Sequence, residues 1–245
     1  MTDLVLATND SGEAEIFASL QGEGPSAGTP VAFIRTSRCN LACSWCDTAY
    51  TWRFEGDNRP HRDGLEFERA ANQVKLSPAE AAERVAETRR KRLVITGGEP
   101  LMQGSALAEM LEHLPDISVE VETNGTTKAP PRLDYRIDQY NVSPKLAHSG
   151  NASELALIPE RLDAYAVDKR AFFKFVIAEP DDVAEVLELQ RHYIIPSDRI
   201  FLMAEGTTSA ALRSRQSWLS QLCLQHDFRM SDRMHIHLFG DTRGT

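Results

Sequence analysis

Cys39, Cys43 and Cys46 form the pattern most able to carry out chemistry in this 245-residue chain. Their Cys-x3-Cys-x2-Cys spacing places three thiolates in one short polar run, residues 38–48, here called the cysteine loop. Closed iron–sulfur clusters and structural zinc sites use four protein ligands. Three ligands would leave one iron of a 4Fe–4S cluster with a free coordination position for a substrate or cofactor. The spacing therefore predicts a cluster that takes part in chemistry rather than one that only stores electrons.

A zinc site and buried reduced thiols are the two other interpretations of these cysteines. Zinc would need a fourth ligand, and the nearest later histidine, His61, lies in a polar stretch without finger-like spacing. Core thiols fit poorly because Asn40, Ser44 and Asp47 make the cysteine loop polar. Cys223 differs from these three cysteines, because it belongs to a series of apolar residues, Trp218, Leu219, Leu222 and Cys223, that recur at helical spacing. We interpret it as a small buried hydrophobic residue.

Composition and charge favour a cytoplasmic enzyme with a small-molecule substrate. The chain is 42% hydrophobic, and its 36 acidic and 27 basic side chains give a net charge of -9, opposite to the field that nucleic-acid binding requires. Four cysteines clustered three to one do not form a disulfide framework. The first ten residues lack the basic start and apolar run of an export signal. We expect no nucleic-acid partner and no membrane association.

Short apolar runs alternate with amphipathic stretches along the chain, which predicts repeated strand–helix units. Six strands are expected at residues 30–35, 93–96, 117–123, 140–143, 172–177 and 199–203, with a seventh candidate at 234–239. A capping box formed by Ser77 and Glu80, with Pro78 between them, opens a helix that should run to about Arg92. Further helices fit residues 105–114, 180–192 and 209–226, with mixed structure over 152–167. This order predicts an α/β fold, an open partial (βα)6 barrel.

Two segments fall outside this alternation. About residues 1–29 precede the first predicted strand, and residues 53–76 are rich in Arg, Asp, Glu, Gly and Asn with few apolar positions. We interpret the second segment as an insertion, part lid and part solvated loop. No internal repeat or Gly/Ser linker divides the chain, so residues 1–245 are expected to form a single domain.

Polar motifs follow the predicted strands at the point where each strand ends. The cysteine loop follows the first strand, Thr-Gly-Gly-Glu-Pro (96–100) the second, Glu-Thr-Asn-Gly (122–125) the third and Ser-Pro-Lys (143–145) the fourth. In a barrel of parallel strands the loops after the carboxyl ends meet at one face. The two glycines also let the backbone approach a ligand closely. The motifs therefore predict one shared site.

With these motifs the chain resembles the radical S-adenosylmethionine (SAM) superfamily, in which three cysteines hold a 4Fe–4S cluster and SAM chelates the fourth iron. The segments Leu-Gln-Gly-Glu-Gly (20–24), Cys-Ser-Trp-Cys-Asp-Thr (43–48), Glu-Thr-Asn-Gly and Ser-Pro-Lys narrow the resemblance to the 7-carboxy-7-deazaguanine synthases. That family implies a Mg2+-dependent ring contraction of 6-carboxy-5,6,7,8-tetrahydropterin to 7-carboxy-7-deazaguanine with loss of ammonia, in the biosynthesis of queuosine and other 7-deazapurines.

The resemblance also implies roles for individual residues. The three cysteines of the cysteine loop would bind the cluster, and Thr48 would bind Mg2+, a hard cation that suits a hydroxyl oxygen. The residues matching SAM contacts are Trp45, Asp47, Gly98, Ser143, Pro144 and Lys145. The residues matching substrate contacts are Leu20, Gln21, Gly22, Arg35, Thr96 and Thr245, with Glu122 and His235 as further candidates. The resemblance thus implies that the N-terminal segment, about residues 1–29, is a substrate loop. The family suggests an external electron donor and a homodimer.

The substrate roles of Arg35 and His235 can be related to the chemistry of their side chains and to their position in the chain. The guanidinium of Arg35 suits a carboxylated substrate because it can make paired charge-assisted hydrogen bonds. Strand alternation in 234–239 could turn either His235 or His237 inward.

Two other functions are compatible with the sequence. Another small radical SAM enzyme, such as a glycyl-radical activase acting on a protein, would share the cysteine loop and the glycine turn. An iron–sulfur electron-transfer module is the non-enzymatic alternative.

Overall fold

The computed structural model describes residues 2–245, and its central feature is one curved sheet of ten strands. Seven neighbouring strands of this sheet are parallel, in the order β3 (Pro30–Thr36), β5 (Arg92–Gly97), β6 (Ser118–Thr123), β7 (Gln139–Val142), β8 (Ala171–Ile177), β9 (Ile200–Ala204) and β10 (Arg229–Ser231). The first six are the strands predicted from the sequence. The sheet curves without closing, so the predicted partial barrel is confirmed.

Three antiparallel strands extend the sheet beyond β3, and the sequence did not predict them. β1 (Leu4–Ala7) pairs with both β3 and β4 (Gln73–Leu76), while β2 (Ile16–Leu20) pairs with β3. Every residue of β1 is buried. Parts of both segments outside the predicted alternation, about 1–29 and 53–76, therefore belong to the sheet.

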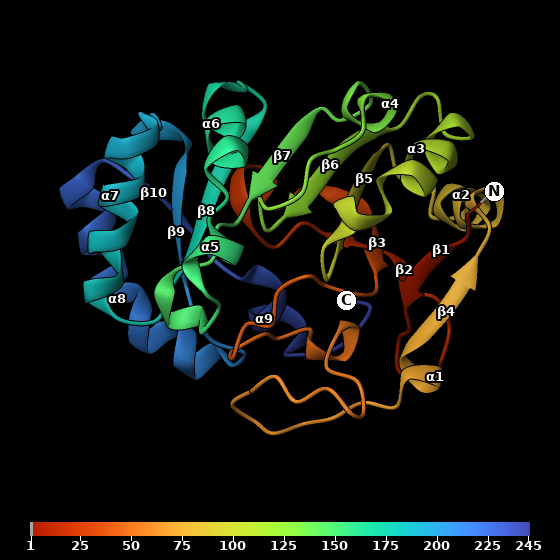
Figure 1. Cartoon of the computed structure of the whole chain (residues 1–245), viewed down its shortest axis with the longest axis horizontal. Coiled ribbons are helices and arrows are strands. Elements are labelled where there is room, and N and C mark those ends of the chain that lie inside the picture. The colour runs from red at the N-terminus through yellow and green to blue at the C-terminus, as the bar shows by residue number, and fades with distance from the viewer. Residues whose placement is uncertain (1) are drawn as a thin grey trace.

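The helices are α1 (Arg69–Asn72), α2 (Pro78–Glu87), α3 (Gly104–Glu112), α4 (Pro131–Asp134), α5 (Ser153–Ala156), α6 (Pro159–Val167), α7 (Val183–Tyr193), α8 (Ser209–His226) and α9 (Met234–Phe239). The longer helices α2, α3, α6, α7 and α8 cover the outer side of the curved sheet, whereas α9 lies at the open end of the barrel, on the inner side (Figure 1). Short 3-10 turns lie at Gly24–Ser26, Ala49–Thr51, Pro100–Gln103, Ala147–Ser149, Pro180–Asp182 and Ser197–Arg199. Across residues 2–245, no helix has the length and apolar character needed to span a bilayer.

Helix α2 begins as predicted but ends earlier. The Ser77 hydroxyl accepts a hydrogen bond from the Glu80 backbone N–H (3.2 Å), and the Glu80 carboxylate accepts one from the Ser77 N–H (2.9 Å), which confirms the capping box. The predicted end near Arg92 is wrong. Thr88 donates its hydroxyl to a backbone carbonyl of the last turn, and Arg89 has a positive φ of 55°, so the chain leaves the helix and enters β5.

The segment 234–239 is helix α9, so the expected seventh strand is wrong. Arg233, just before it, donates hydrogen bonds to Glu23 and to the Gly206 carbonyl, which turns the chain away from β10 and across the open end of the barrel. Strand alternation consequently does not decide the direction of the two histidines. The side chain of His235 lines the central cavity, whereas His237 contacts Ser209 (Nδ1 to Oγ, 2.9 Å).

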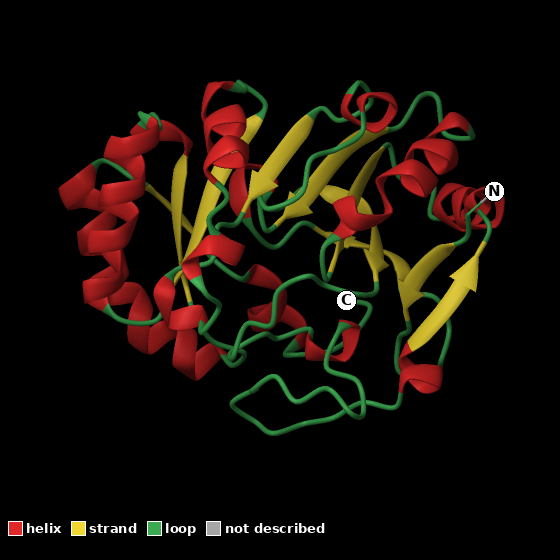
Figure 2. Cartoon of the chain, viewed as in Figure 1, coloured by secondary structure: helices red, strands yellow, loops and turns green. Residues whose placement is uncertain are grey.

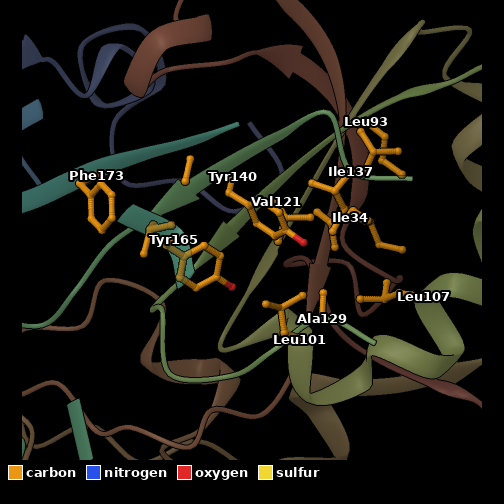
Figure 3. Packing of buried hydrophobic residues seen from close by; sticks show 14 of the residues in the cluster. Ile34, Leu93, Leu101, Leu107, Val121, Ala129, Ile137, Tyr140, Tyr165 and Phe173 are labelled. Carbon is orange, nitrogen blue, oxygen red and sulfur yellow. The ribbon is translucent and has the colours of Figure 1, made fainter. Parts of the chain in front are cut away.

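The main core lies between the sheet and its outer helices. Figure 3 shows side chains of five successive parallel strands in this layer, Ile34, Leu93, Val121, Tyr140 and Phe173, with Leu107 of α3 on the side of Ile34 and Tyr165 of α6 on the side of Phe173. Because side chains alternate along a strand, their neighbours in sequence face the concave inner side. On that inner side β3, β5, β6, β7 and β8 present polar residues, which are Arg35, Thr96, Glu122, Asn141 and Lys174. The outer side of the sheet is therefore apolar, whereas the inner side is mixed: its polar residues lie beside a smaller apolar cluster of Val31, Phe33 and Val94.

Candidate active site

A cavity of about 390 Å³ lies on the concave side of the sheet, beside the loops that follow the carboxyl ends of the parallel strands. Its wall combines the polar inner-face residues with the cysteine loop, the glycine turn after β5 and the segment 240–245. In Figure 1 the C-terminal end of the chain lies at the middle of the molecule, close to these loops. The long loop between Thr51 and α1, seen in Figure 2, adds Leu65 and Phe67 to the wall.

The three predicted cluster ligands, Cys39, Cys43 and Cys46, all line this cavity and none forms a disulfide. Burial raises the pKa of the Cys39 thiol to about 12 and that of Cys46 to about 11. Iron binds the thiolate form, so loading a cluster must release protons from these buried thiols. Three thiols facing one cavity fit a cluster bound through three sulfurs.

The glycine turn after β5 packs directly on the cysteine loop. A Cβ added at Gly98 would lie 2.2 Å from the Arg38 carbonyl oxygen, and one at Gly97 would lie 2.2 Å from that of Thr36. The next residue, Glu99, is fully buried and accepts hydrogen bonds from the Asn124 and Leu101 backbone N–H groups (2.7 and 3.1 Å). Burial raises the pKa of Glu99 to about 7 against these donors. Glu99 therefore ties the turn after β5 to the loop after β6.

Trp45 supplies a polar atom that no protein group satisfies. Its Nε1 is buried and has no hydrogen-bond partner within residues 2–245, and its ring stacks on His148 at 5.5 Å between centroids. Lys145 lies over the same ring, 5.8 Å from its centroid, and donates to the Ser143 hydroxyl (2.8 Å). A buried indole donor beside a lysine can provide hydrogen-bond and stacking partners for a bound ligand.

The inner faces of β5 and β6 carry a hydrogen-bonded group of neutral and acidic side chains. Gln21 Nε2 donates to Glu120 (2.8 Å) and to Glu122 (3.2 Å), while the Thr96 hydroxyl donates to the other oxygen of Glu122 (2.8 Å). Burial raises the pKa of Glu120. Of the two carboxylates, that of Glu122 lines the cavity, and its oxygens can accept hydrogen bonds from the N–H groups of a heterocycle.

Arg35 forms the cationic part of the wall. Its Nε donates to Glu15 (2.9 Å), which is 1% exposed and also accepts the Tyr50 hydroxyl (2.9 Å). Burial alone would lower the pKa of Arg35, but Glu15 outweighs it and raises that pKa, so the guanidinium stays charged. Within residues 2–245 its two Nη groups make no hydrogen bond to protein, which leaves them free for an anionic group.

Glu23 is the centre of a network of ion pairs at the open end of the barrel. Its carboxylate pairs with Lys174 of β8 and with Arg233 (Nε, 3.1 Å), and His235 Nε2 lies 3.9 Å away. Arg233 also pairs with Asp47 of the cysteine loop. Burial would raise the pKa of Glu23, but the two cations hold it well below its usual range. This network joins the N-terminal segment, the cysteine loop and α9.

The cavity brings together nearly all of the predicted site residues. Those that line it are Cys39, Cys43, Cys46, Thr48, Trp45, Asp47, Gly98, Ser143, Lys145, Leu20, Gln21, Gly22, Arg35, Thr96, Thr245, Glu122 and His235. Pro144 is the one predicted residue that does not line it within residues 2–245. Sequence reasoning missed the lining residues Glu15, Glu23, Tyr50, Asn141, Lys174 and Arg233. Strand alternation could have found Asn141 and Lys174, whereas nothing local marks Arg233.

Comparisons with known proteins indicate the family of the chain. The Radical SAM superfamily model matches residues 33–148. A 7-carboxy-7-deazaguanine synthase of Pyrobaculum aerophilum is 38% identical over 234 residues, which cover 94% of this chain and 95% of the relative. The enzyme of the same name from Hyperthermus butylicus is 33% identical, covering 91% and 90%. The crystal structure of QueE from Escherichia coli has a TM-score of 0.65 at 25% identity, covering 94% of this chain and 95% of that one.

Proposed function

Since the chain belongs to the 7-carboxy-7-deazaguanine synthase family of radical SAM enzymes, we propose that it converts 6-carboxy-5,6,7,8-tetrahydropterin to 7-carboxy-7-deazaguanine with release of ammonia and a requirement for Mg2+. One observation carries the proposal. The three cysteine thiols share a cavity with a free guanidinium face and with carboxylates suited to a heterocycle. An electron-transfer module would have no use for such a polar chamber beside its cluster.

The cofactor end of the cavity would be formed by the cysteine loop and the glycine turn. Cys39, Cys43 and Cys46 would hold a 4Fe–4S cluster, and the SAM contacts would come from Trp45, Asp47, Gly98, Ser143, Pro144 and Lys145. When bound, cluster and SAM together supply one-electron reduction and hydrogen-atom abstraction. The unpartnered Nε1 of Trp45 and the close approach of the Gly98 backbone support this end as the SAM site.

The substrate end would be formed by the inner faces of β3, β5 and β6. The Nη groups of Arg35 would bind the substrate carboxylate in a paired, charge-assisted contact. Thr96 and Glu122, already hydrogen-bonded to each other, would accept and orient the N–H edge of the pterin. Leu20, Gln21, Gly22, His235 and Thr245 would complete this wall. Leu65 and Phe67 of the long loop would exclude water from the reacting centre.

Thr48 would take part in holding Mg2+. Thr48 lines the cavity and its hydroxyl lies 3.6 Å from Cys46 Sγ, and hard cations prefer oxygen ligands. Because Mg2+ keeps several waters and accepts ligands from substrate, the protein would need to supply few ligands of its own. Omitting Mg2+ after chelator treatment should lower turnover, and Ca2+ should restore it poorly.

Anaerobic reconstitution tests the whole proposal. The protein is loaded with iron and sulfide, then given dithionite, SAM, Mg2+ and the tetrahydropterin, and 5′-deoxyadenosine and 7-carboxy-7-deazaguanine are measured by mass spectrometry. Both products are expected. Cys43→Ala should lose the cluster and both products, while Cys223→Ala, which changes a buried cysteine of α8 outside the cavity, should keep them.

The remaining outcomes separate the alternatives. 5′-Deoxyadenosine without the deazaguanine would keep the radical SAM chemistry and move the substrate elsewhere, for example to a protein. Neither product from a protein with a reducible cluster would favour electron transfer. The proposal further includes an external one-electron donor, a cytoplasmic location and a homodimer. Sedimentation analysis of the loaded protein would test whether it is a dimer.

A further inference from the structure

Asn151 makes a direct contact with the sulfur of Cys43. Its Nδ2 lies 3.3 Å from Cys43 Sγ, and its Oδ1 accepts a hydrogen bond from the Ala42 backbone N–H at 2.9 Å. A backbone N–H can only donate, so the oxygen of the amide must face Ala42. The amide orientation is thereby decided by its partners, and the NH2 group points at the sulfur.

The segment that carries Asn151 is fixed to the cysteine loop at further points. The Ser149 hydroxyl oxygen accepts from Asn151 Nδ2 (3.2 Å), and the Ser149 carbonyl accepts from the Ser44 N–H (2.9 Å). Gly150 between them has a φ of 78°, which makes the tight turn possible. Residues 149–151 therefore form a bracket that holds a donor in place against the sulfur.

The other two cysteines of the loop have weaker contacts of this kind. Asn124 Nδ2 lies 3.9 Å from Cys39 Sγ and makes a shorter hydrogen bond to Asn40 Oδ1 (3.0 Å). The Thr48 hydroxyl lies 3.6 Å from Cys46 Sγ, and either atom could be the donor. The Leu41 backbone N–H and the Trp52 side chain are further hydrogen-bond partners, of Cys39 and Cys46 respectively. Of the two side-chain amides that contact a cysteine sulfur within residues 2–245, Asn151 lies closer and has the better-defined orientation.

We propose that Asn151 is a positioning residue that raises the reduction potential of the cluster by donating a hydrogen bond to the Cys43 sulfur. The inference rests on the proposed function, because it takes Cys43 as a cluster ligand. Reduction adds negative charge to the iron–thiolate unit, and a hydrogen bond strengthens when its acceptor becomes more negative. Donors to cluster sulfurs therefore favour the reduced state, which must form before SAM is cleaved.

The test is a potentiometric titration of the reconstituted full-length protein, followed by electron paramagnetic resonance and without SAM. Asn151→Leu removes the donor at similar volume, while Asn151→Asp keeps an oxygen for the Ala42 N–H and replaces the donor with a carboxylate oxygen. Both variants should retain iron and sulfide at wild-type content. At a fixed potential the ratio of reduced to oxidised cluster should fall by about fivefold to tenfold in Asn151→Leu and further in Asn151→Asp; a tenfold change equals about 59 mV for one electron.

Asn58 offers a matched control, because it is exposed on the long loop and contacts no cysteine sulfur within residues 2–245. Asn58→Leu and Asn58→Asp should leave the potential unchanged. Wild-type potentials in fully loaded Asn151 variants would overturn the inference. Loss of iron from both variants would also overturn it, by assigning Asn151 to holding the loop. Failure of the wild-type protein to form a 4Fe–4S cluster would instead refute the proposed function itself.

Discussion

Replacing Arg35 with Met should separate its contribution to stability from its contribution to substrate binding. Glu15, the partner of its Nε, is 1% exposed, so the variant would leave a carboxylate buried with only the Tyr50 hydroxyl to satisfy it. Removing one partner of a buried ion pair costs about 3–5 kcal/mol. Chemical denaturation of the metal-free protein should show a loss of free energy of unfolding of this size.

The catalytic effect follows from the two free Nη groups of Arg35. Each hydrogen bond to a charged group contributes about 1.5–3 kcal/mol. Losing both should raise the barrier from free enzyme and substrate by at least about 3 kcal/mol, which lowers kcat/KM for the tetrahydropterin by about 100-fold or more. Arg35→Lys keeps the charge but not the paired geometry, so it should lie between the wild type and Arg35→Met. Initial rates of deazaguanine formation by the reconstituted enzyme give both values.

A double variant distinguishes the two effects of Arg35→Met. Adding Glu15→Gln removes the buried charge, so the double variant should be more stable than Arg35→Met while its kcat/KM stays low. A kcat/KM within threefold of wild type in Arg35→Met would refute the substrate role of Arg35. Equal stability of the single and double variants would refute the explanation by an unpaired buried carboxylate.

Three further predictions concern the cavity wall. Gly98→Ala should destabilise the protein by about 1–3 kcal/mol and lower its cluster content, because the added Cβ meets a carbonyl of the cysteine loop, whereas Gly56→Ala, with nothing within 4 Å, should keep its full cluster content. Glu23 has a lowered pKa in the folded state, so its ion pairs stabilise the protein fully above about pH 4.5 and less as the pH falls below that value. Unfolding titrations should therefore show that the wild type loses more free energy of unfolding than Glu23→Gln between about pH 5 and about pH 3. Arg243 lies 3.6 Å above the Tyr50 ring and fixes the segment 240–245, so Arg243→Gln should raise KM more than it lowers kcat and should speed amide exchange in that segment.

The predicted parts of the fold and site depend on local signals. The six predicted parallel strands are short segments with several β-branched or aromatic residues, and the capping box at Ser77 marks the start of α2. The motifs after these strands meet at one cavity because parallel strands end at the same edge. The proximity of the cysteine loop and the glycine turn could therefore be predicted without knowing the order of the strands.

The parts that escaped prediction depend on contacts between distant segments. β1 and β4 are four residues each; they pair with each other, and β1 also pairs with β3. Arg233 forms ion pairs with Glu23 and Asp47, which are far from it in the sequence. No local sequence pattern around Arg233 predicts these partners. The same contacts turn residues 234–239 into a helix, although their alternation of types suits a strand equally well.

Alternation within the parallel strands is the signal that could have revealed more of the site. Parallel strands covered by helices on both faces are apolar throughout. In β6 the sequence Ser-Val-Glu-Val-Glu-Thr instead alternates, and Asn141 and Lys174 interrupt β7 and β8 in the same way. A buried charge is costly unless it meets a partner, so a sheet with such residues must have an inner face lined by ion pairs, water or ligand. Polar alternation in a parallel strand therefore indicates both the open barrel and the side on which we propose that the substrate binds.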